Sequence, residues 1–286
     1  MARKLIVLGS LVLLLLTSVM VTRGVAGQKV EVGADVPAQR RVGIDEIRHD
    51  AWNGLLAKYV DAAGLVDYRA WKASEPDVQT LNDYLSLLSH ADVSRPASRA
   101  STLAFWINAY NAVTVKGMLR EYPTTSIRNH TAKVVGYNIW DDLLLIVGGE
   151  RYSLNDMEHK VLRKLGEPRI HFAIVCASIG CPRLLNEAYV PNRLDEQLTT
   201  NARHFFADPA KFRTDQTGQL HVSPILEWFA EDFGATLPDR LRTISPFLPN
   251  DESKRIATGG TARVSYLDYD WGINDRAIEA SRAGNR

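Results

Sequence analysis

The chain has 286 residues, of which 45% are hydrophobic and 23% are charged. This composition is that of an ordinary globular protein, and the length suits one large domain or two small ones. Lys and Arg total 34 and Asp and Glu total 33, so the formal net charge is +1. A charge so close to zero excludes non-specific attraction to polyanions, and we expect no nucleic-acid partner.

The first residues have the pattern of an export signal. Arg3 and Lys4 precede an apolar run over 5–21, and residues 25–27 are the small residues that signal peptidase prefers. An uncleaved anchor is the alternative, because the run is near the lower end of the roughly 17–25 residues that span a bilayer. We predict an exported protein, periplasmic or secreted, that touches the membrane only if this segment is retained.

The domain organisation follows from where periodic patterns begin. Residues 28–44 contain Gly33 and Pro37 but little apolar periodicity, which is typical of a linker. We predict a signal peptide over 1–27, a linker over 28–44 and a single globular domain over 45–286.

Apolar residues recur at helical spacing in six segments of this domain. The third of them is apolar over most of its girth and is stopped by Pro123, and the fourth begins with Ser153 and Asp156 at an N-cap and ends at Gly166. The predicted helices span 47–60, 76–89, 97–121, 153–166, 193–207 and 226–233.

Short hydrophobic runs between these helices predict strands. One pair of runs flanks Gly148 and Gly149 and suggests a hairpin. The predicted extended segments lie at 65–68, within 134–152, and at 170–176, 221–223 and 264–267. The sequence therefore predicts an α+β fold, a single domain in which several helices pack around a small, mainly antiparallel sheet.

Two amides stand out on the predicted helix 97–121. The string F-W-I-N-A-Y-N-A at 105–112 places Asn108 and Asn111 at i and i+3, on one face of an otherwise apolar element. Buried amides need hydrogen-bond partners. Asn108, Asn111 and the adjacent Tyr110 are therefore candidates to bind a substrate, or else to bond a neighbouring loop and fix its course.

The segment H-F-A-I-V-C-A-S-I-G-C-P at 171–182 is the main candidate for chemistry. Cys176 stands where the predicted strand ends, and such positions present a reactive group from a rigid scaffold. If the strand is regular, its side chains alternate, and His171 and Cys176 face opposite sides. His159, beside Glu158 on the preceding helix, is then a second candidate base.

Cys176 and Cys181 are the two cysteines of the chain. In an exported protein they could pair as a disulfide, or one thiol could stay free to react. Their C-x4-C spacing lacks the tight two-residue knuckle of most structural zinc sites, and it is not the C-x-x-C of thioredoxin-like proteins. We predict no metal site and no cofactor.

The ordered motifs resemble a known family. F-W-I-N-A-Y-N-A at 105–112, S-L-N-D-M-E-H at 153–159, the 171–182 segment and Y-D-W at 269–271 are similar to the domain-of-unknown-function 547 family. The resemblance covers most of the chain after the linker and implies no particular activity. It singles out these positions of this chain: Asn108, Asn111, Glu158, His159, His171, Cys176, Ser178 and Cys181.

These residues support three hypotheses. The first is a thiol-dependent hydrolase or acyl transferase with Cys176 as nucleophile, His159 or His171 as base and Glu158 orienting the imidazole. Its unknown small-molecule or peptide ligand would be bound by Asn108, Asn111, Tyr110, Arg163 and Ser178. The second is a non-catalytic binding or scaffold module with a Cys176–Cys181 disulfide. The third is a redox protein in which this pair cycles between dithiol and disulfide.

Overall fold

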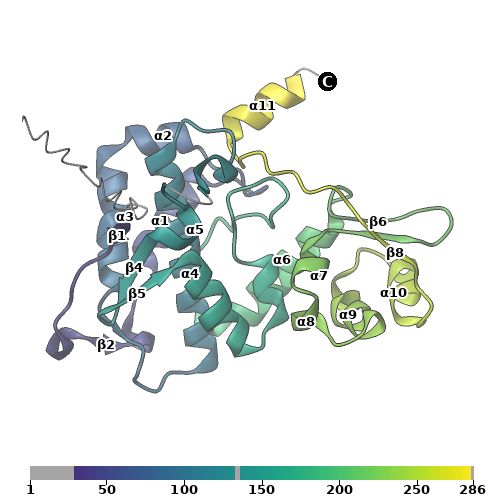
Figure 1. Cartoon of the computed structure of the whole chain (residues 1–286), viewed down its shortest axis with the longest axis horizontal. Coiled ribbons are helices and arrows are strands. Elements are labelled where there is room, and N and C mark those ends of the chain that lie inside the picture. Colours follow the sequence, from purple (N-terminus) through teal and green to yellow (C-terminus); the bar gives the residue numbers. More distant parts are fainter. Residues whose placement is uncertain (1–28, 133–135, 285–286) are drawn as a thin grey trace, which may run out of the picture.

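The computed structural model describes residues 29–132 and 136–284. The predicted signal peptide, 1–27, lies outside the described residues. In the first half of the chain, three helices pack around a long central one (Figure 1): α1 (Asp50–Tyr59), α2 (Tyr68–Ala73), α3 (Glu75–Leu88) and the central α4 (Arg99–Glu121). The predicted helices 47–60, 76–89 and 97–121 are confirmed, whereas α2 was not predicted.

Large aromatic side chains fill the space between these helices. Trp52 stacks on Tyr84 at 5.9 Å between ring centroids, and Tyr59 stacks on Trp71 at 4.7 Å. Both tryptophans are fully buried. Burying such rings removes 150–250 Å² of surface each, so this cluster contributes much of the stability of the N-terminal half.

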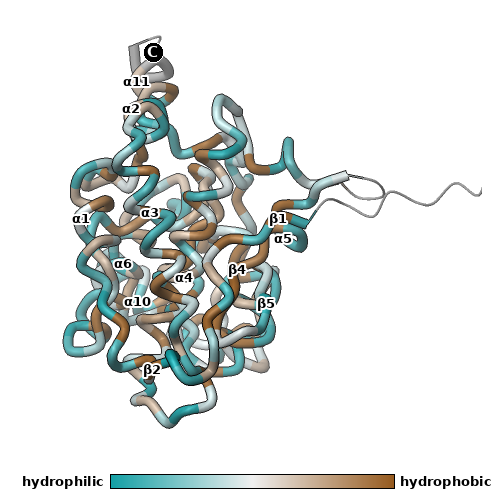
Figure 2. Tube along the Cα trace, turned by 90° about the vertical axis from the view of Figure 1, so that its left-hand side faces the viewer, coloured by the Kyte–Doolittle hydropathy of each residue, from teal (hydrophilic) through white to brown (hydrophobic). Residues whose placement is uncertain are grey.

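A three-stranded sheet packs against these helices in the order β1-β4-β5 (Val30–Val32, Leu143–Val147, Glu150–Ser153). β4 and β5 form the predicted hairpin, and every residue of β4 is buried. Figure 2 shows β4 as a continuous hydrophobic stretch beside α4. β1 pairs in parallel with β4, so residues predicted to be a linker form part of the sheet.

Three further elements lie near this sheet. β2 (Val42–Gly43) also belongs to the predicted linker, and it pairs in parallel with β3 (Ala91–Asp92). α5 (Ile139–Asp142) leads directly into β4. The two-residue pairing of β2 with β3 is held mainly by the side chains packed around it.

The second half of the chain forms a smaller hydrophobic cluster around Phe172, Phe205 and Phe206. Its sheet has the order β6-β7-β8, with β6 and β7 antiparallel and β7 and β8 parallel. Figure 1 shows its short helices on the side away from β1 and β4, with α6 between the two halves. The elements are α6 (Leu194–Ala207), β6 (Phe212–Thr214), β7 (Leu220–Val222), α7 (Ile225–Trp228), α8 (Ala230–Phe233), α9 (Leu237–Ile244), α10 (Asp251–Thr258) and β8 (Val264–Tyr266). The last helix, α11 (Arg276–Gly284), returns to the first half, where Asp275 pairs with Val66.

The prediction of a strand over 170–176 is wrong. Pro168 instead starts a short 3-10 helix, η6 (Pro168–Phe172), whose N-cap is Glu167, because the carboxylate of Glu167 accepts a hydrogen bond from the Arg169 N–H. The apolar run reflects complete burial, which periodicity alone does not distinguish from a buried strand. The predicted alternation of His171 and Cys176 is therefore absent.

The predicted helix 153–166 is confirmed as helical but has unusual winding. It contains the π-helix η4 (Asp156–Leu162), followed by the 3-10 turn η5 (Arg163–Leu165) and by Gly166 in the left-handed conformation. π-helical turns often occur at functional sites. The predicted helix 226–233 is likewise divided into α7 and α8.

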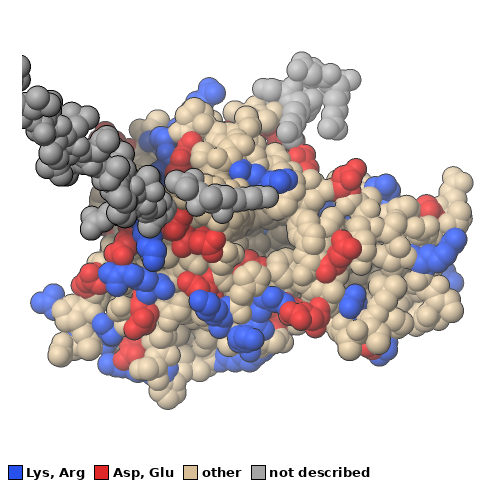
Figure 3. Space-filling model, viewed as in Figure 1, with Lys and Arg blue, Asp and Glu red and all other residues tan. Residues whose placement is uncertain are grey.

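The α+β fold predicted from the sequence is confirmed, with helices packed around small sheets. Parallel and antiparallel pairings occur together, so the sheets are mixed. Figure 3 shows acidic and basic side chains interspersed on the face in view, as the near-zero net charge implies. Within 29–132 and 136–284, no helix is long and apolar enough to cross a membrane.

Candidate functional site

The loop that follows η6 is fixed by the two asparagines of α4. Asn111 donates to the Ala173 carbonyl at 3.0 Å and accepts from the Val175 N–H at 2.9 Å. Asn108 makes the same reciprocal pair with the backbone of Tyr189. Each side-chain amide thus makes the hydrogen bonds that the backbone of a neighbouring strand would otherwise make to a buried chain segment.

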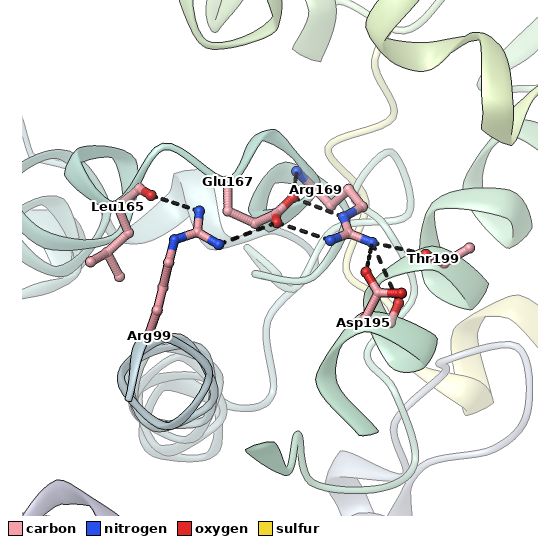
Figure 4. Close-up of polar contacts among 6 residues, drawn as sticks. All are labelled: Arg99, Leu165, Glu167, Arg169, Asp195 and Thr199. Carbon is pink, nitrogen blue, oxygen red and sulfur yellow. Dashed lines mark hydrogen bonds and ion pairs between the residues drawn. The ribbon is translucent and has the colours of Figure 1, made fainter. Parts of the chain in front are cut away.

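An ion-pair network holds η6 from its other side (Figure 4). Arg169 pairs with Glu167 at 2.8 Å and with Asp195 at 2.7 Å, and Arg99 of α4 donates to the Leu165 carbonyl at 2.8 Å. Glu167 and Arg169 are both largely buried, and a bidentate pair in such surroundings fixes direction as well as distance. The network therefore ties η6, which carries His171, to α4 and α6.

Cys176 and Cys181 form a disulfide, with their Cα atoms 6.3 Å apart. Cys181 is 5% exposed, whereas Cys176 is only partly buried. Between them, Ala177 has a φ of 58°, a left-handed conformation that costs a non-glycine residue of order 1 kcal/mol. In this state neither cysteine carries a thiol.

The segment after β8 lies along the disulfide loop. The N–H groups of Ile179 and Gly180 donate to the carbonyls of Gly272 and Asp270, both at 2.8 Å. A Cβ atom at Gly180 would lie 2.9 Å from the Tyr269 ring, so glycine permits this close approach. The pairing places the Tyr269 hydroxyl 3.0 Å from Cys181 Sγ and 3.3 Å from Cys176 Sγ.

His171 is held by a carboxylate. Its Nε2 lies 2.7 Å from Asp232 Oδ2, and its ring stacks on Phe229 at 4.1 Å between centroids. Asp232 also accepts two hydrogen bonds from Arg163, which pairs with Glu231 as well. Although burial raises the pKa of Asp232, the hydrogen bonds from His171 and Arg163 hold it well below its usual range.

Burial is the largest influence on the pKa of this histidine. It lowers the pKa of His171, although the hydrogen bond to Asp232 opposes the shift. The imidazole is therefore neutral at pH 7 and can accept a proton. Asp232 orients it, as a carboxylate does for the histidine of many hydrolases.

Glu158 is the second titratable group of the site. Its side chain is buried and accepts a hydrogen bond of 3.3 Å from the Tyr110 hydroxyl. Burial raises the pKa of Glu158 to about 7, although the hydrogen bond from Tyr110 and the charge of Arg163 oppose the shift. A carboxyl that titrates near neutral pH can both give and take a proton.

These groups surround a cavity of about 130 Å³. Six of its thirteen lining residues are Phe, Tyr or Trp, and the exposed Trp228 packs against Tyr269 and Trp271. The lining residues are Tyr110, Trp140, Glu158, His171, Ile174, Cys176, Cys181, Pro182, Ile225, Trp228, Phe229, Tyr269 and Trp271. A small apolar cavity with a few convergent polar groups is the usual form of a ligand site.

The cavity brings together five of the predicted site residues: Tyr110, Glu158, His171, Cys176 and Cys181. The prediction that strand alternation separates His171 from Cys176 is wrong. The helix η6 and the loop after it bring both residues to the cavity. The prediction that Glu158 orients an imidazole is also wrong, because its hydrogen bond is to Tyr110 and Asp232 takes that role for His171.

The other predicted residues, including the exposed His159, are not part of the cavity lining. His159 contacts Arg163 at 3.1 Å, and Arg163 bonds Asp232. Ser178 is buried, and its hydroxyl oxygen lies 3.0 Å from Cys176 Sγ. The side chains of Asn108 and Asn111 form their hydrogen bonds with backbone groups. This is the loop-fixing role that the sequence left open as an alternative. None of these residues lines the cavity.

Sequence reasoning missed Asp232 and the aromatic wall. Asp232 follows Phe229 on a predicted helix, and nothing in its local pattern distinguishes it from a solvated carboxylate. Tyr269 and Trp271 had a signal, because they belong to the Y-D-W motif of the family resemblance. That motif is nearly 90 residues from Cys181, and only the fold brings them together.

We expect the buried carboxyl to make stability depend on pH. The folded pKa of Glu158 is raised from 4.5 to about 7, so between these values the folded state binds more protons than the unfolded state. Stability therefore falls as pH rises through this window. Glu158→Gln removes this loss, and urea unfolding at pH 5 and pH 8 measures it as a difference of about 2–3 kcal/mol from the wild type.

The exposed Glu252 of α10 provides a matched control. Glu252→Gln is expected to leave the pH dependence of the wild type unchanged. An identical loss of stability in Glu158→Gln and in the wild type would show that Glu158 does not titrate in this window.

The fold and cavity define a class of protein: an α+β domain whose disulfide opens on an aromatic cavity with a buried glutamate and an aspartate-held histidine. Residues 94–206 match the model of the family described as "Protein of unknown function, DUF547", which confirms the resemblance over this segment. The matched residues include the disulfide, Glu158 and His171, but Asp232 and the Y-D-W motif lie outside. Neither the comparison with curated proteins nor that with solved structures finds a match.

Proposed function

We propose that this protein is an exported thiol–disulfide redox protein, in which the Cys176–Cys181 disulfide exchanges with thiols of a peptide or small molecule held at the aromatic cavity. The observation that carries this proposal is that both cysteines line a cavity shared with Glu158, whose pKa is about 7. A disulfide with only a structural role needs neither a ligand-sized cavity nor a neighbouring group that exchanges protons at neutral pH.

The two sulfurs differ in a way that suits exchange. Cys176 is partly exposed and Cys181 is buried. Thiol–disulfide exchange proceeds by attack on one sulfur through a mixed disulfide, and access decides which sulfur is attacked. Cys176 is therefore the sulfur attacked by substrate, and Cys181 is the leaving group when the protein disulfide opens.

Glu158 supplies the proton balance of this exchange. Oxidation of a substrate dithiol moves two electrons and two protons to the protein, which ends with two thiols. A carboxyl with a pKa of about 7 in the same cavity can carry these protons at neutral pH. Export agrees with this chemistry, because disulfides form and persist in oxidising compartments.

Stoichiometric transfer to a dithiol peptide tests the proposal. The native oxidised protein is mixed with a peptide that contains two cysteines and an aromatic residue, and the products are separated at intervals. We expect peptide disulfide and protein dithiol to appear together, one for one, without unfolding of the protein. A protein that lacks both cysteines is the control, and a native disulfide that stays intact would contradict the proposal.

A second candidate function rests on a different observation, the His171–Asp232 pair at the same cavity. In a reduced protein, Cys176 with this pair would have the groups of a thiol hydrolase or acyl transferase. The Cys181→Ser variant keeps Cys176 as a free thiol and tests this function with activated acyl esters. Ester turnover by this variant that His171→Gln abolishes would support it, and stoichiometric acylation without turnover would exclude it.

A further inference from the structure

The hydroxyl of Tyr269 lies against both sulfurs of the disulfide. It donates a hydrogen bond to Cys181 Sγ at 3.0 Å and lies 3.3 Å from Cys176 Sγ. The Ser178 hydroxyl in turn donates to the Tyr269 oxygen at 3.1 Å. This relay directs the single phenolic proton toward Cys181.

A second donor points at the same sulfur. The backbone N–H of Cys176 lies 3.0 Å from Cys181 Sγ. Cys181 Sγ therefore has two donors, although a disulfide sulfur is a weak acceptor. A thiolate at this position accepts both hydrogen bonds far more strongly, because hydrogen bonds to an ionised acceptor are about twice as strong as neutral ones.

The environment keeps the phenol protonated. Burial raises the pKa of Tyr269, the hydrogen bond from Ser178 opposes this shift, and the charges of Glu158 and Asp270 add to it. Tyr269 thus remains a hydrogen-bond donor throughout the neutral range.

The inference rests on the proposed redox function: we propose that Tyr269 is a catalytic residue, whose hydroxyl stabilises the Cys181 thiolate that leaves when the disulfide opens. A substrate thiolate attacks Cys176 Sγ, the bond between the two protein sulfurs breaks, and its electron pair goes to Cys181 Sγ. A second substrate thiolate then attacks the substrate sulfur of the mixed disulfide, and the electron pair goes to Cys176 Sγ. The protons lost by the two substrate thiols end on the two protein thiols.

Tyr269→Phe tests this role with little disturbance of packing. The phenyl ring keeps the contacts of Tyr269 with Trp228 and Trp271, and only the hydroxyl is lost. The change is made in a Cys176→Ser background, where Cys181 is the single thiol and its ionisation is followed by thiolate absorbance as pH is raised. We expect the pKa of the Cys181 thiol to rise by about one unit when the hydroxyl is removed.

The same change in the otherwise wild-type protein makes the reduced state less favourable. We expect the equilibrium constant for reduction by glutathione at neutral pH to fall by up to about tenfold, equivalent to a potential about 30 mV more negative. Tyr266→Phe is the matched control, because Tyr266 is 41% exposed on β8. It is expected to change neither quantity.

An unchanged pKa of the Cys181 thiol in Tyr269→Phe would overturn the inference. This result is separable from failure of the redox function, because the pKa is measured on a variant that has no disulfide to exchange. A wild-type disulfide that thiols cannot open would refute the redox function and, with it, the catalytic role of Tyr269.

Discussion

The Cys181→Ser variant is expected to form a stable mixed disulfide with a peptide disulfide through Cys176, whereas Cys176→Ser is expected to form almost none. The free Cys176 thiol is partly exposed at the cavity, so it attacks the substrate and retains the adduct when no second protein thiol can resolve it. Cys181 is 5% exposed and is shielded from the same attack.

Intact-protein mass spectrometry at fixed times measures this asymmetry. We expect adduct to form at least 100-fold faster with Cys181→Ser than with Cys176→Ser, because burial denies a peptide disulfide access to Cys181. Both variants carry the same cysteine-to-serine change, so each serves as the control for the other. Equal rates, or a faster Cys176→Ser variant, would reverse the assignment of the attacked sulfur.

Asn111→Ala is expected to destabilise the fold by about 2–4 kcal/mol. The side chain satisfies the Ala173 carbonyl and the Val175 N–H, and both groups are left unpaired and buried when it is removed. Few surface substitutions exceed 0.5 kcal/mol, so the loss is easily distinguished. Denaturant unfolding by far-ultraviolet circular dichroism measures it.

The control for this prediction is Asn129→Ala, since Asn129 is exposed and its side-chain amide donates to two nearby threonine hydroxyls. We expect a change within about 0.5 kcal/mol. Because Ala173 and Val175 lead into the disulfide loop, Asn111→Ala should also loosen the site. Similar stabilities of the two alanine variants would mean that Asn111 does not hold this loop.

The long, strongly periodic elements could be predicted from the sequence. α4 is apolar around most of its circumference and is stopped by Pro123, so both its existence and its end were readable. The β4–β5 hairpin carried its turn in Gly148 and Gly149. In these elements the local pattern and the tertiary packing favour the same structure.

The segment 170–176 shows where this reasoning fails. Its apolar residues are buried on all sides, so the sequence carries no period that separates a strand from an irregular buried turn. The Pro168 start and the Glu167 cap decide the structure. This error also affected the predicted site, because the expected strand alternation placed His171 and Cys176 on opposite faces.

The candidate site was located from its own motif but not completed. Cys176, Glu158 and His171 were named from the sequence, and all three line the cavity. Asp232 and Tyr269 come from distant segments. Tyr269 is positioned by backbone pairing between the disulfide loop and the residues after β8, and Asp232 by the packing of α8 against His171. No spacing rule within one sequence predicts contacts of this range.

The reduction potential of the Cys176–Cys181 pair tests the central claim most directly. The native protein is equilibrated with glutathione buffers of defined ratio, and the fraction of dithiol is counted after acid trapping. We expect a potential of roughly −120 to −270 mV, the range of proteins that exchange disulfides catalytically. A potential below about −300 mV is that of a structural disulfide, and it would contradict the account.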